Sequence, residues 1–252
     1  MDNTVVNNRL IWDQTHDWSQ DGDEWQGQAV RCGKPYEAWK ASLAETLLLP
    51  NLTPAATVLE IGPGHGRWTR FMAGRVGRLV LVDISQNCLD FCRRALAPMA
   101  VETHLSSGAT LPPDLTGAVD FIWSYDAFVH VDRREAGLYL KEMARVLVPG
   151  GRAVIHHPNR RHATLWLGFL RRLGKRGAAL YRRISMGPPR DDDGWRANVS
   201  GQLFAGLAAA AGLKVESQLA WWRDGFGVPR YNDRITILSK PDLSKPDLSK
   251  PA

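Results

Sequence analysis

Short apolar runs alternate with longer amphipathic segments through the middle of the chain. The apolar runs predict strands at 57–61, 78–82, 101–105, 119–123 and 151–156. The segments between them carry apolar residues at helical spacing and predict helices at 66–75, 85–97 and 133–147. Repeated strand–helix order is typical of a parallel sheet with helices on both faces. The pattern therefore predicts an α/β, doubly wound fold.

The same alternation resumes near the end of the chain. It predicts a helix at 200–211 and strands at 213–222 and 234–238, which bring the sheet to seven strands. The pattern is interrupted at 159–198, after the fifth predicted strand. We expect this insertion to form a lid over the substrate side of the sheet.

Segments of different character lie at the two ends. Residues 1–50 mix tryptophan with acidic and amide residues and end in a helical pattern at 36–49, so we expect an N-terminal helical cap on the substrate side of a main domain at 51–238. Residues 239–252 repeat the pentapeptide SKPDL, which has regularly spaced prolines and little apolar content. Such a segment buries too little apolar surface to offset its ordering entropy, and we expect a disordered tail.

Composition limits the classes of protein that fit. With 252 residues, 44% of them hydrophobic, the chain has enough apolar content for one sizeable core. No stretch approaches the ~20 apolar residues of a membrane span, and residues 1–9 lack the basic and apolar character of a leader. We expect a cytoplasmic protein that does not bind membranes. The net charge of +6 is concentrated at 144–190, which has no acidic residue.

Three glycines at alternate positions follow the first predicted strand. They are Gly62, Gly64 and Gly66, and Glu60 precedes them inside the strand. Glycines permit a tight turn and let backbone N–H groups approach a ligand at the start of a helix. Asp83 ends the second predicted strand, where a carboxylate can accept the hydroxyls of a ribose. Together these residues predict a nucleoside-containing cofactor.

A nicotinamide-dependent dehydrogenase also has a glycine loop followed by an acid. The spacing here is G-x-G-x-G rather than G-x-G-x-x-G, and the acid Glu60 lies within the preceding strand. A carboxylate there would repel a pyrophosphate but suits a cofactor that carries an ammonium and a sulfonium group. The loop therefore favours S-adenosylmethionine over a dinucleotide.

The motifs EIGPGHG, LVLVD, VDFIWSYDAFVHV and LVPGG resemble those of the class I S-adenosylmethionine-dependent methyltransferases over about 57–157. The resemblance implies a Rossmann-like sheet, mostly parallel with an antiparallel last strand, and S-adenosylmethionine as the cofactor. The family often has an acid after the third strand, whereas this chain has Ser106-Ser107-Gly108-Ala109. The implied cofactor residues are Glu60, Gly62, Gly64, Gly66, Trp68, Asp83, Ile84, Ser107, Gly108, Ser124 and Tyr125.

Methylation of a hydroxyl needs a group that removes its proton, and candidates follow the fourth and fifth predicted strands. His157 is the preferred general base, because an imidazole titrates near neutrality. His156, Asp126 and His130 are the other candidates. His156 and His157 are adjacent in an extended segment, so they face opposite sides and only one points easily into a given pocket. A divalent metal such as magnesium, held by Asp126 with His156 or His157, is an open alternative.

The acceptor is predicted on weaker grounds. The segments IHHPN and WRANVS resemble bacterial methyltransferases related to sugar O-methylation. Together with the aromatic N-terminal segment they favour a hydroxylated small molecule, a sugar or glycoside, as the acceptor. We expect Trp25, Tyr36, Asn159 and Trp195 to contact it.

Two other functions stay open. The basic stretch at 160–190 suggests a nucleic acid or another polyanion as the substrate. Base N-methylation is disfavoured, because Ser124-Tyr125-Asp126-Ala127 replaces the prolines and aromatic residue of that motif. The other alternative is a non-catalytic binding protein on the same fold, against which the intact glycine loop and Asp83 argue. Whether the chain forms a homodimer is also open.

Overall fold

A computed structural model describes residues 4–160, 174, 176, 196–242 and 244. It contains a seven-stranded sheet in the order β3-β2-β1-β4-β5-β7-β6. All neighbouring pairs are parallel except those of β7, which runs antiparallel to β5 and β6. The strands are β1 Thr57–Ile61, β2 Arg78–Asp83, β3 Glu102–Leu105, β4 Val119–Ser124, β5 Leu147–His157, β6 Lys214–Leu219 and β7 Arg234–Ser239. The predicted Rossmann-like sheet with an antiparallel last strand is confirmed.

Helices cover both faces of this sheet. The α-helices are α1 Val5–Leu10, α2 Gly27–Cys32, α3 Tyr36–Leu43, α4 Thr69–Met72, α5 Gln86–Ala95, α6 Arg133–Val146 and α9 Gly201–Ala210. The shorter turns are η1 Ile11–Thr15, η2 Ala44–Leu48, η3 Leu49–Asn51, η4 Pro113–Leu115, η5 Phe128–His130, η6 Arg223–Gly225 and η7 Arg230–Asn232. Polar N-caps begin four of the described helices, because Thr4, Ser85, Asp132 and Ser200 accept hydrogen bonds from backbone N–H groups of α1, α5, α6 and α9.

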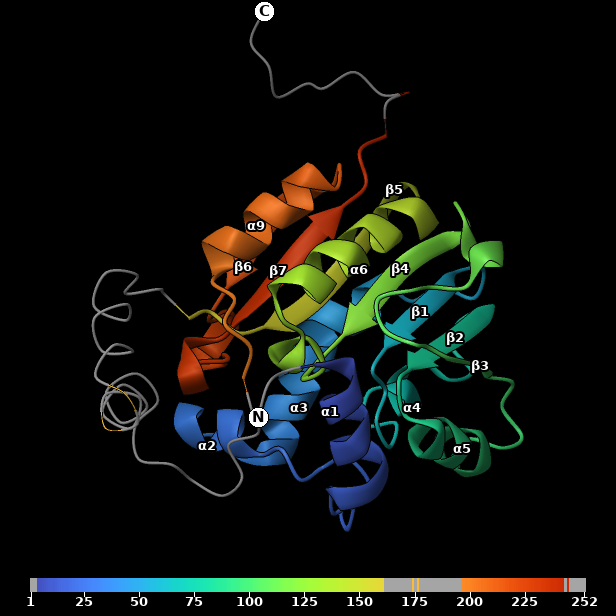
Figure 1. Cartoon of the computed structure of the whole chain (residues 1–252). Helices are drawn as coiled ribbons and strands as arrows, with labels where there is room; N and C mark the ends of the chain where they lie inside the picture. The colour runs from blue at the N-terminus through green and yellow to red at the C-terminus, as the bar shows by residue number, and fades with distance from the viewer. Residues whose placement is uncertain (1–3, 161–173, 175, 177–195, 243, 245–252) are drawn as a thin grey trace, which may run out of the picture.

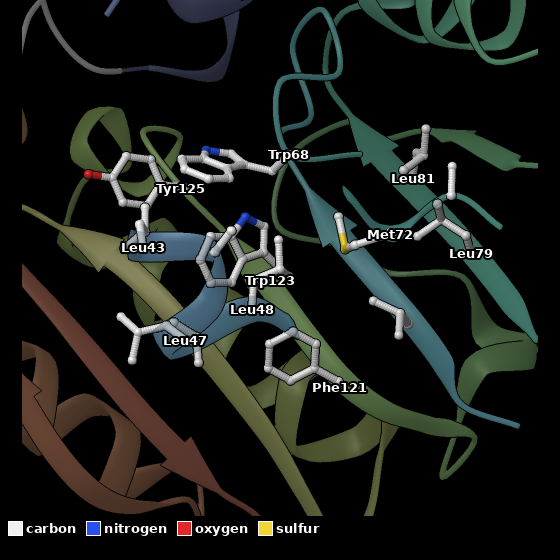
Figure 2. Packing of buried hydrophobic residues seen from close by; sticks show 14 of the residues in the cluster. Leu43, Leu47, Leu48, Trp68, Met72, Leu79, Leu81, Phe121, Trp123 and Tyr125 are labelled. Carbon is white, nitrogen blue, oxygen red and sulfur yellow. The ribbon is translucent and has the colours of Figure 1, made fainter. Parts of the chain in front are cut away.

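Strand alternation divides the core into two layers. On β4, Phe121 and Trp123 face the cluster that contains α3, η2 and α5, whereas Ile122 faces the cluster that contains α6 and α9. Figure 2 shows part of the first layer, in which Leu43, Leu47 and Leu48 pack beside the indole of Trp123. Side chains at successive positions of a strand therefore meet entirely different surroundings.

The N-terminal helices lie at one end of the sheet. In Figure 1, α1, α2 and α3 lie at the end toward which the arrows of β1, β2 and β4 point. Trp39 of α3 is fully buried in the first layer, which fixes this helix against the sheet. The carboxyl ends of the central strands, where α/β proteins bind their ligands, are therefore covered by residues from the beginning of the chain.

Several boundaries differ from those predicted. The helix expected at 66–75 is reduced to α4, because positive φ angles at Gly62, Gly64 and Gly66 keep the preceding chain in a loop. β6 ends at Leu219 instead of 222, and the chain then turns so that Trp221 pairs with Gly227. α3 continues beyond Leu43 only as the π-turn η2 and the short turn η3.

Two predictions fall wholly or mainly outside the described residues. They are the lid at 159–198, of which 161–173, 175 and 177–195 are not described, and the disordered tail, of which 243 and 245–252 are not described. Among the described residues, no helix is long and apolar enough to cross a membrane.

Candidate active site

A pocket lies at the carboxyl ends of β1, β2 and β4. The part formed by the ends of β2 and β3 with α1 is called the nucleoside half, after the ligand that the sequence predicts there. The second half is formed by the ends of β1 and β4 with residues from both ends of the chain. The nucleoside half includes Val5, Asn8, Asp83, Ile84, Gly108, Val131 and Tyr139. The second half, called the acceptor half below, includes Trp12, Trp18, Trp25, Arg67, Tyr125, Asp126, His130, Arg196, Arg230 and Tyr231.

The glycine loop connects the two halves. Gly62 and Gly64 line the pocket and have φ angles of 72° and 54°. A Cβ on Gly62 would lie 2.4 Å from the Cβ of Ala127, so no larger residue fits without moving the loop after β4. The loop therefore combines a left-handed backbone with close approach of two chain segments, which requires glycine. Gly66 is buried and does not line the pocket.

One partly buried and one buried carboxyl group flank this loop. Asp83 Oδ1 accepts a hydrogen bond of 2.9 Å from the Ser85 backbone, and Oδ2 lies 3.4 Å from the Gly64 nitrogen. Burial raises the pKa of Asp83 to about 6. Glu60 is more deeply buried, accepts a 2.6 Å hydrogen bond from the Thr69 hydroxyl, and has a pKa that burial raises to about 8. Asp83 lines the pocket, where donors of a ligand can stabilise its charge, whereas Glu60 does not line the pocket and its raised pKa favours the protonated acid at neutral pH.

Helix α1 closes the nucleoside half. The Arg9 guanidinium donates to the carbonyl oxygens of Ile84, at 3.0 Å, and Ser106, at 3.1 Å. Asn8 donates a 3.0 Å hydrogen bond to the carbonyl oxygen of His130. These contacts join α1 to the ends of β2 and β3 and to η5, so the helix spans the place where a nucleoside would lie.

Aromatic rings from the N-terminal segment cover the acceptor half. Trp12, Trp18 and Trp25 all line the pocket, and the ring of Trp12 lies 5.1 Å from that of His130. Trp18 stacks on His65 of the glycine loop, with ring centroids 4.3 Å apart. The N-terminal segment therefore contributes mainly aromatic side chains to the acceptor half, which suits a flat or ring-shaped ligand.

Charged side chains that contact one another border the acceptor half, in the order Arg67, Asp126, His156, Asp233 and Arg196, and are called the floor below. Asp126 pairs with Arg67 on one side and lies 3.0 Å from Nδ1 of His156 on the other. His156 Nε2 lies 3.3 Å from Asp233, whose Oδ2 lies 2.7 Å from Arg196 Nη1. Asp126 has a φ of 64°, a conformation that costs free energy for a residue with a side chain and is maintained here by its two partners.

Charges set the ionisation of these groups. Burial opposes ionisation of Asp126, but Arg67 and His156 hold the pKa of its carboxyl well below its usual range. Burial likewise lowers the pKa of His156, but hydrogen bonds and charges from Asp126 and Asp233 reverse this and raise it. The floor therefore presents ionised Asp126 beside the guanidinium of Arg67.

Comparison with known proteins agrees with this geometry. Residues 58–151 match a family model described as a methyltransferase domain. Magnesium protoporphyrin IX methyltransferase from Synechocystis PCC 6803, determined with bound S-adenosylmethionine, has the same fold, with a TM-score of 0.62 at 14% identity over 95% of this chain and 98% of that one. The matched residues, which are less than half of the chain, thus resemble a methyltransferase domain, and the chain shares its fold with a structure that binds S-adenosylmethionine.

Curated relatives of this methyltransferase match over part of their length. The biotin biosynthesis bifunctional protein BioHC of Cellvibrio japonicus (strain Ueda107) is 36% identical over 107 residues, which are 42% of this chain and 20% of the relative. Methyltransferase GfsG of Streptomyces halstedii is 31% identical over 102 residues, which are 39% of this chain and 36% of the relative. The matched region thus spans well under half of either relative.

The structure brings many of the predicted cofactor residues of the methyltransferase to one pocket. Gly62, Gly64, Trp68, Asp83, Ile84, Gly108 and Tyr125 line it. Ser107 is exposed and Ser124 is buried with its hydroxyl on the Ile61 carbonyl, 2.7 Å away, so neither lines the pocket. After β3 it is the backbone of Gly108 that faces the nucleoside half.

The predicted catalytic histidines are separated by the sheet. His156 stacks on Tyr125, with centroids 4.2 Å apart, on the α3 face. His157 stacks on Phe204 of α9, 4.0 Å away, on the other face, and its Nε2 lies 2.6 Å from the Thr236 hydroxyl. Burial lowers the pKa of His157 to about 3, and the residue does not line the pocket. Its position therefore does not suit the general base that the sequence suggested.

A metal shared by Asp126 and His157 does not fit this geometry either. Asp126 contacts His156, and His157 lies across the sheet from both. Among the described residues, no three histidine, cysteine, aspartate or glutamate side chains converge on one point.

The predicted acceptor residues have mixed positions. Trp25 lines the pocket. Tyr36 lies outside it and donates a 2.6 Å hydrogen bond to Asp23, and Asn159 accepts one of 2.8 Å from the Gly201 backbone. These two side chains hold elements together instead of lining the acceptor half. Trp195 lies outside the described residues.

Sequence reasoning missed several residues of the methyltransferase pocket. Arg67 follows the glycine motif directly, so its place in the sequence was a usable signal. Asn8, Arg9 and Asp233 gave no such signal, because they reach the site only through the fold of the two chain ends.

Proposed function

We propose that this methyltransferase transfers the methyl group of S-adenosylmethionine to a hydroxyl oxygen of a small molecule, a sugar or glycoside. The observation that carries the proposal is the acceptor half itself. Trp12, Trp18 and Trp25 line the same pocket as Arg67, Tyr125 and Asp126 and as the nucleoside half. Indole faces can cover a sugar ring while the charged and hydroxyl groups orient its hydroxyls.

We further propose His130 as the general base. It belongs to η5, directly after β4, and among His130, His156 and His157 it alone lines the pocket. In the reaction the acceptor oxygen attacks the methyl carbon, the carbon–sulfur bond breaks, and S-adenosylhomocysteine leaves as a neutral thioether. The acceptor proton passes to the His130 imidazole, which acts as the base.

The charged floor would position the acceptor. Asp126 cannot take the proton readily, because its pKa is held well below its usual range by Arg67 and His156. It can accept a hydrogen bond from a second hydroxyl of the acceptor and so fix the orientation of the attacking oxygen. The alternative of a polyanion substrate depended on 160–190, most of which lies outside the described residues, and no observation favours it.

The test is an acceptor screen with labelled S-adenosylmethionine, led by methyl glycosides and uronic acids. His130→Ala should lower turnover by about 100-fold or more while the affinity for S-adenosylhomocysteine is retained. His130→Gln should also lose the acidic limb of the pH–rate profile, because glutamine does not titrate.

The matched control is His104→Ala, on the edge strand β3 and away from the pocket. Turnover of His130→Ala equal to that of the control would reject His130 as the base. Tight binding of S-adenosylhomocysteine without methylation of any hydroxylated compound would reject the acceptor class.

A further inference from the structure

The turn η7, just before β7, holds a tyrosine in an unusual backbone conformation. Tyr231 has a φ of 60° and a ψ of 12°, in the left-handed region, and Asn232 after it also has a φ of 60°. Every other described residue with a positive φ is a glycine, an aspartate or an asparagine. Aspartate and asparagine tolerate this region, whereas a bulky side chain meets a steric cost there. Tyr231 is therefore the outlier among the described residues.

Hydrogen bonds from both sides impose this conformation on the turn. The Gln28 side chain of α2 accepts a hydrogen bond of 2.8 Å from the backbone N–H of Arg230 and donates one of 3.3 Å to the carbonyl oxygen of Arg230. On the other side, Nη1 of Arg234 donates to the carbonyl oxygens of Asn232, at 3.0 Å, and Asp233, at 2.7 Å. A strained backbone persists where its surroundings determine it in this way, and such residues gather at functional sites.

The side chain of Tyr231 faces the pocket and not the core. It belongs to neither of the two core layers and is only partly buried. It lines the acceptor half, where the guanidinium carbons of Arg196 and Arg230 lie 4.2 and 4.8 Å from the centre of its ring. These contacts hold the ring in place. A costly backbone conformation that presents an aromatic side chain to a pocket indicates a role in ligand binding.

The chemistry of the side chain indicates what it recognises. An aromatic ring distinguishes poorly between similar sugars, whereas a phenol hydroxyl donates and accepts hydrogen bonds and so distinguishes a hydroxyl from a hydrogen atom. We propose that Tyr231 is a specificity-determining residue of the acceptor half, whose phenol pairs with a hydroxyl of the acceptor other than the one that is methylated. The attacking hydroxyl is excluded because its proton goes to His130. The inference rests on the proposed function and deepens it, because it assigns the choice among hydroxylated acceptors to one side chain.

The first experiment compares methyl glucoside with its monodeoxy analogues. In wild type, replacing one particular hydroxyl by hydrogen should lower kcat/KM by about fivefold to tenfold, the value of one hydrogen bond. Tyr231→Phe should lower kcat/KM for methyl glucoside by the same factor and show no further loss with that analogue. The variant keeps the ring beneath the two guanidinium groups, so it should fold normally. The same dependence on every hydroxyl in wild type and variant would overturn the inference and leave the O-methyltransferase proposal intact.

The second experiment separates the acceptor from the cofactor. The affinity for S-adenosylhomocysteine should be the same in wild type and in Tyr231→Phe, because the phenol is assigned to the acceptor. A loss of that affinity equal to the loss in kcat/KM would assign the tyrosine to the cofactor and overturn the inference.

A third experiment needs no acceptor and covers the case in which no sugar is methylated. Tyr231→Gly removes the ring and adopts the left-handed conformation without steric cost, so its midpoint of unfolding in urea should equal or exceed that of wild type. The matched control is Asp224→Gly, at an exposed residue outside the pocket that also has a φ of 60°. A retained midpoint would support a role in ligand binding even though the sugar proposal has failed. A midpoint below those of wild type and control would assign the ring to folding and overturn the inference.

Discussion

Two properties of Asp83 should make ligand binding in the nucleoside half depend on its ionisation, namely its place in the pocket and its raised pKa. Its carboxylate ends β2 within the pocket, and backbone N–H groups of Ser85 and Gly64 approach it. Burial nevertheless raises its pKa to about 6, so without cofactor it takes up a proton in weakly acidic solution. A carboxylate that accepts ribose hydroxyls must be ionised to bind them well.

Asp83→Asn should weaken binding of S-adenosylhomocysteine by about 10- to 100-fold, since hydrogen bonds to a charged group contribute about 1.5 to 3 kcal/mol each. The affinity of the wild type should fall as the pH is lowered through about 6, because the proton bound by free Asp83 must leave before the cofactor binds. The variant should lack this dependence. Titration calorimetry between pH 5 and 8 measures both effects, with Asp90→Asn as the control, and a wild-type affinity that is flat across this range would contradict the role of Asp83.

At the scale of elements, the short helix α1 lines one side of the nucleoside half. It has only six residues, too few to be stable alone, and Arg9 and Asn8 fasten it to the loops after β2, β3 and β4. Residues that fasten a cover are expected to influence how long the ligand stays more than how fast it arrives.

Arg9→Ala should raise the dissociation rate of S-adenosylhomocysteine by about tenfold, because two hydrogen bonds between α1 and the loops of the pocket are lost. The association rate should change little. Stopped-flow displacement measures both rates. Arg31→Ala, an exposed arginine of α2, is the matched control, and a dissociation rate that equals the control would show that α1 does not retain the cofactor.

On the scale of the whole molecule, the two ends of the chain form one structure over the sheet. Nε1 of Trp39 donates a 2.8 Å hydrogen bond to the Gly227 carbonyl, and Nε1 of Trp222 donates one of 2.9 Å to the Ser42 hydroxyl. Gln28 reaches the buried Asp233 at 3.2 Å. The N-terminal cap is thus bonded to the last part of the chain as well as packed on the sheet.

Trp39→Ala should destabilise the protein by about 3 to 5 kcal/mol, because the indole is fully buried in the core. Since the cap shares this core with the sheet, unfolding in urea should remain a single transition at a lower midpoint. Fluorescence and circular dichroism should give the same midpoint. Trp221→Ala, at a side chain that is 50% exposed, should change the midpoint little; a separate early transition in Trp39→Ala would show that the cap unfolds independently.

The sequence by itself determined the sheet and the cofactor loop. Hydrophobic periodicity located all seven strands. The central strands β1, β2 and β4 are apolar over most of their length because helices cover both faces of the sheet, whereas β3 and β6, at its edges, carry polar residues. The glycines and Asp83 could be recognised because a sharp turn and a ribose-binding acid lie at fixed distances along the chain. The glycines and Asp83 lie close together in the sequence, so their spacing along the chain is enough to reveal them.

Only the tertiary structure decided which polar residues line the pocket. His156 and His157 are adjacent in sequence, and their roles differ because the register of β5 turns one toward Tyr125 and the other toward Phe204. Arg67, Tyr125 and Arg196 come from three separate segments and meet only where the ends of the strands converge. This convergence depends on every element that packs around the pocket and on no single stretch of sequence.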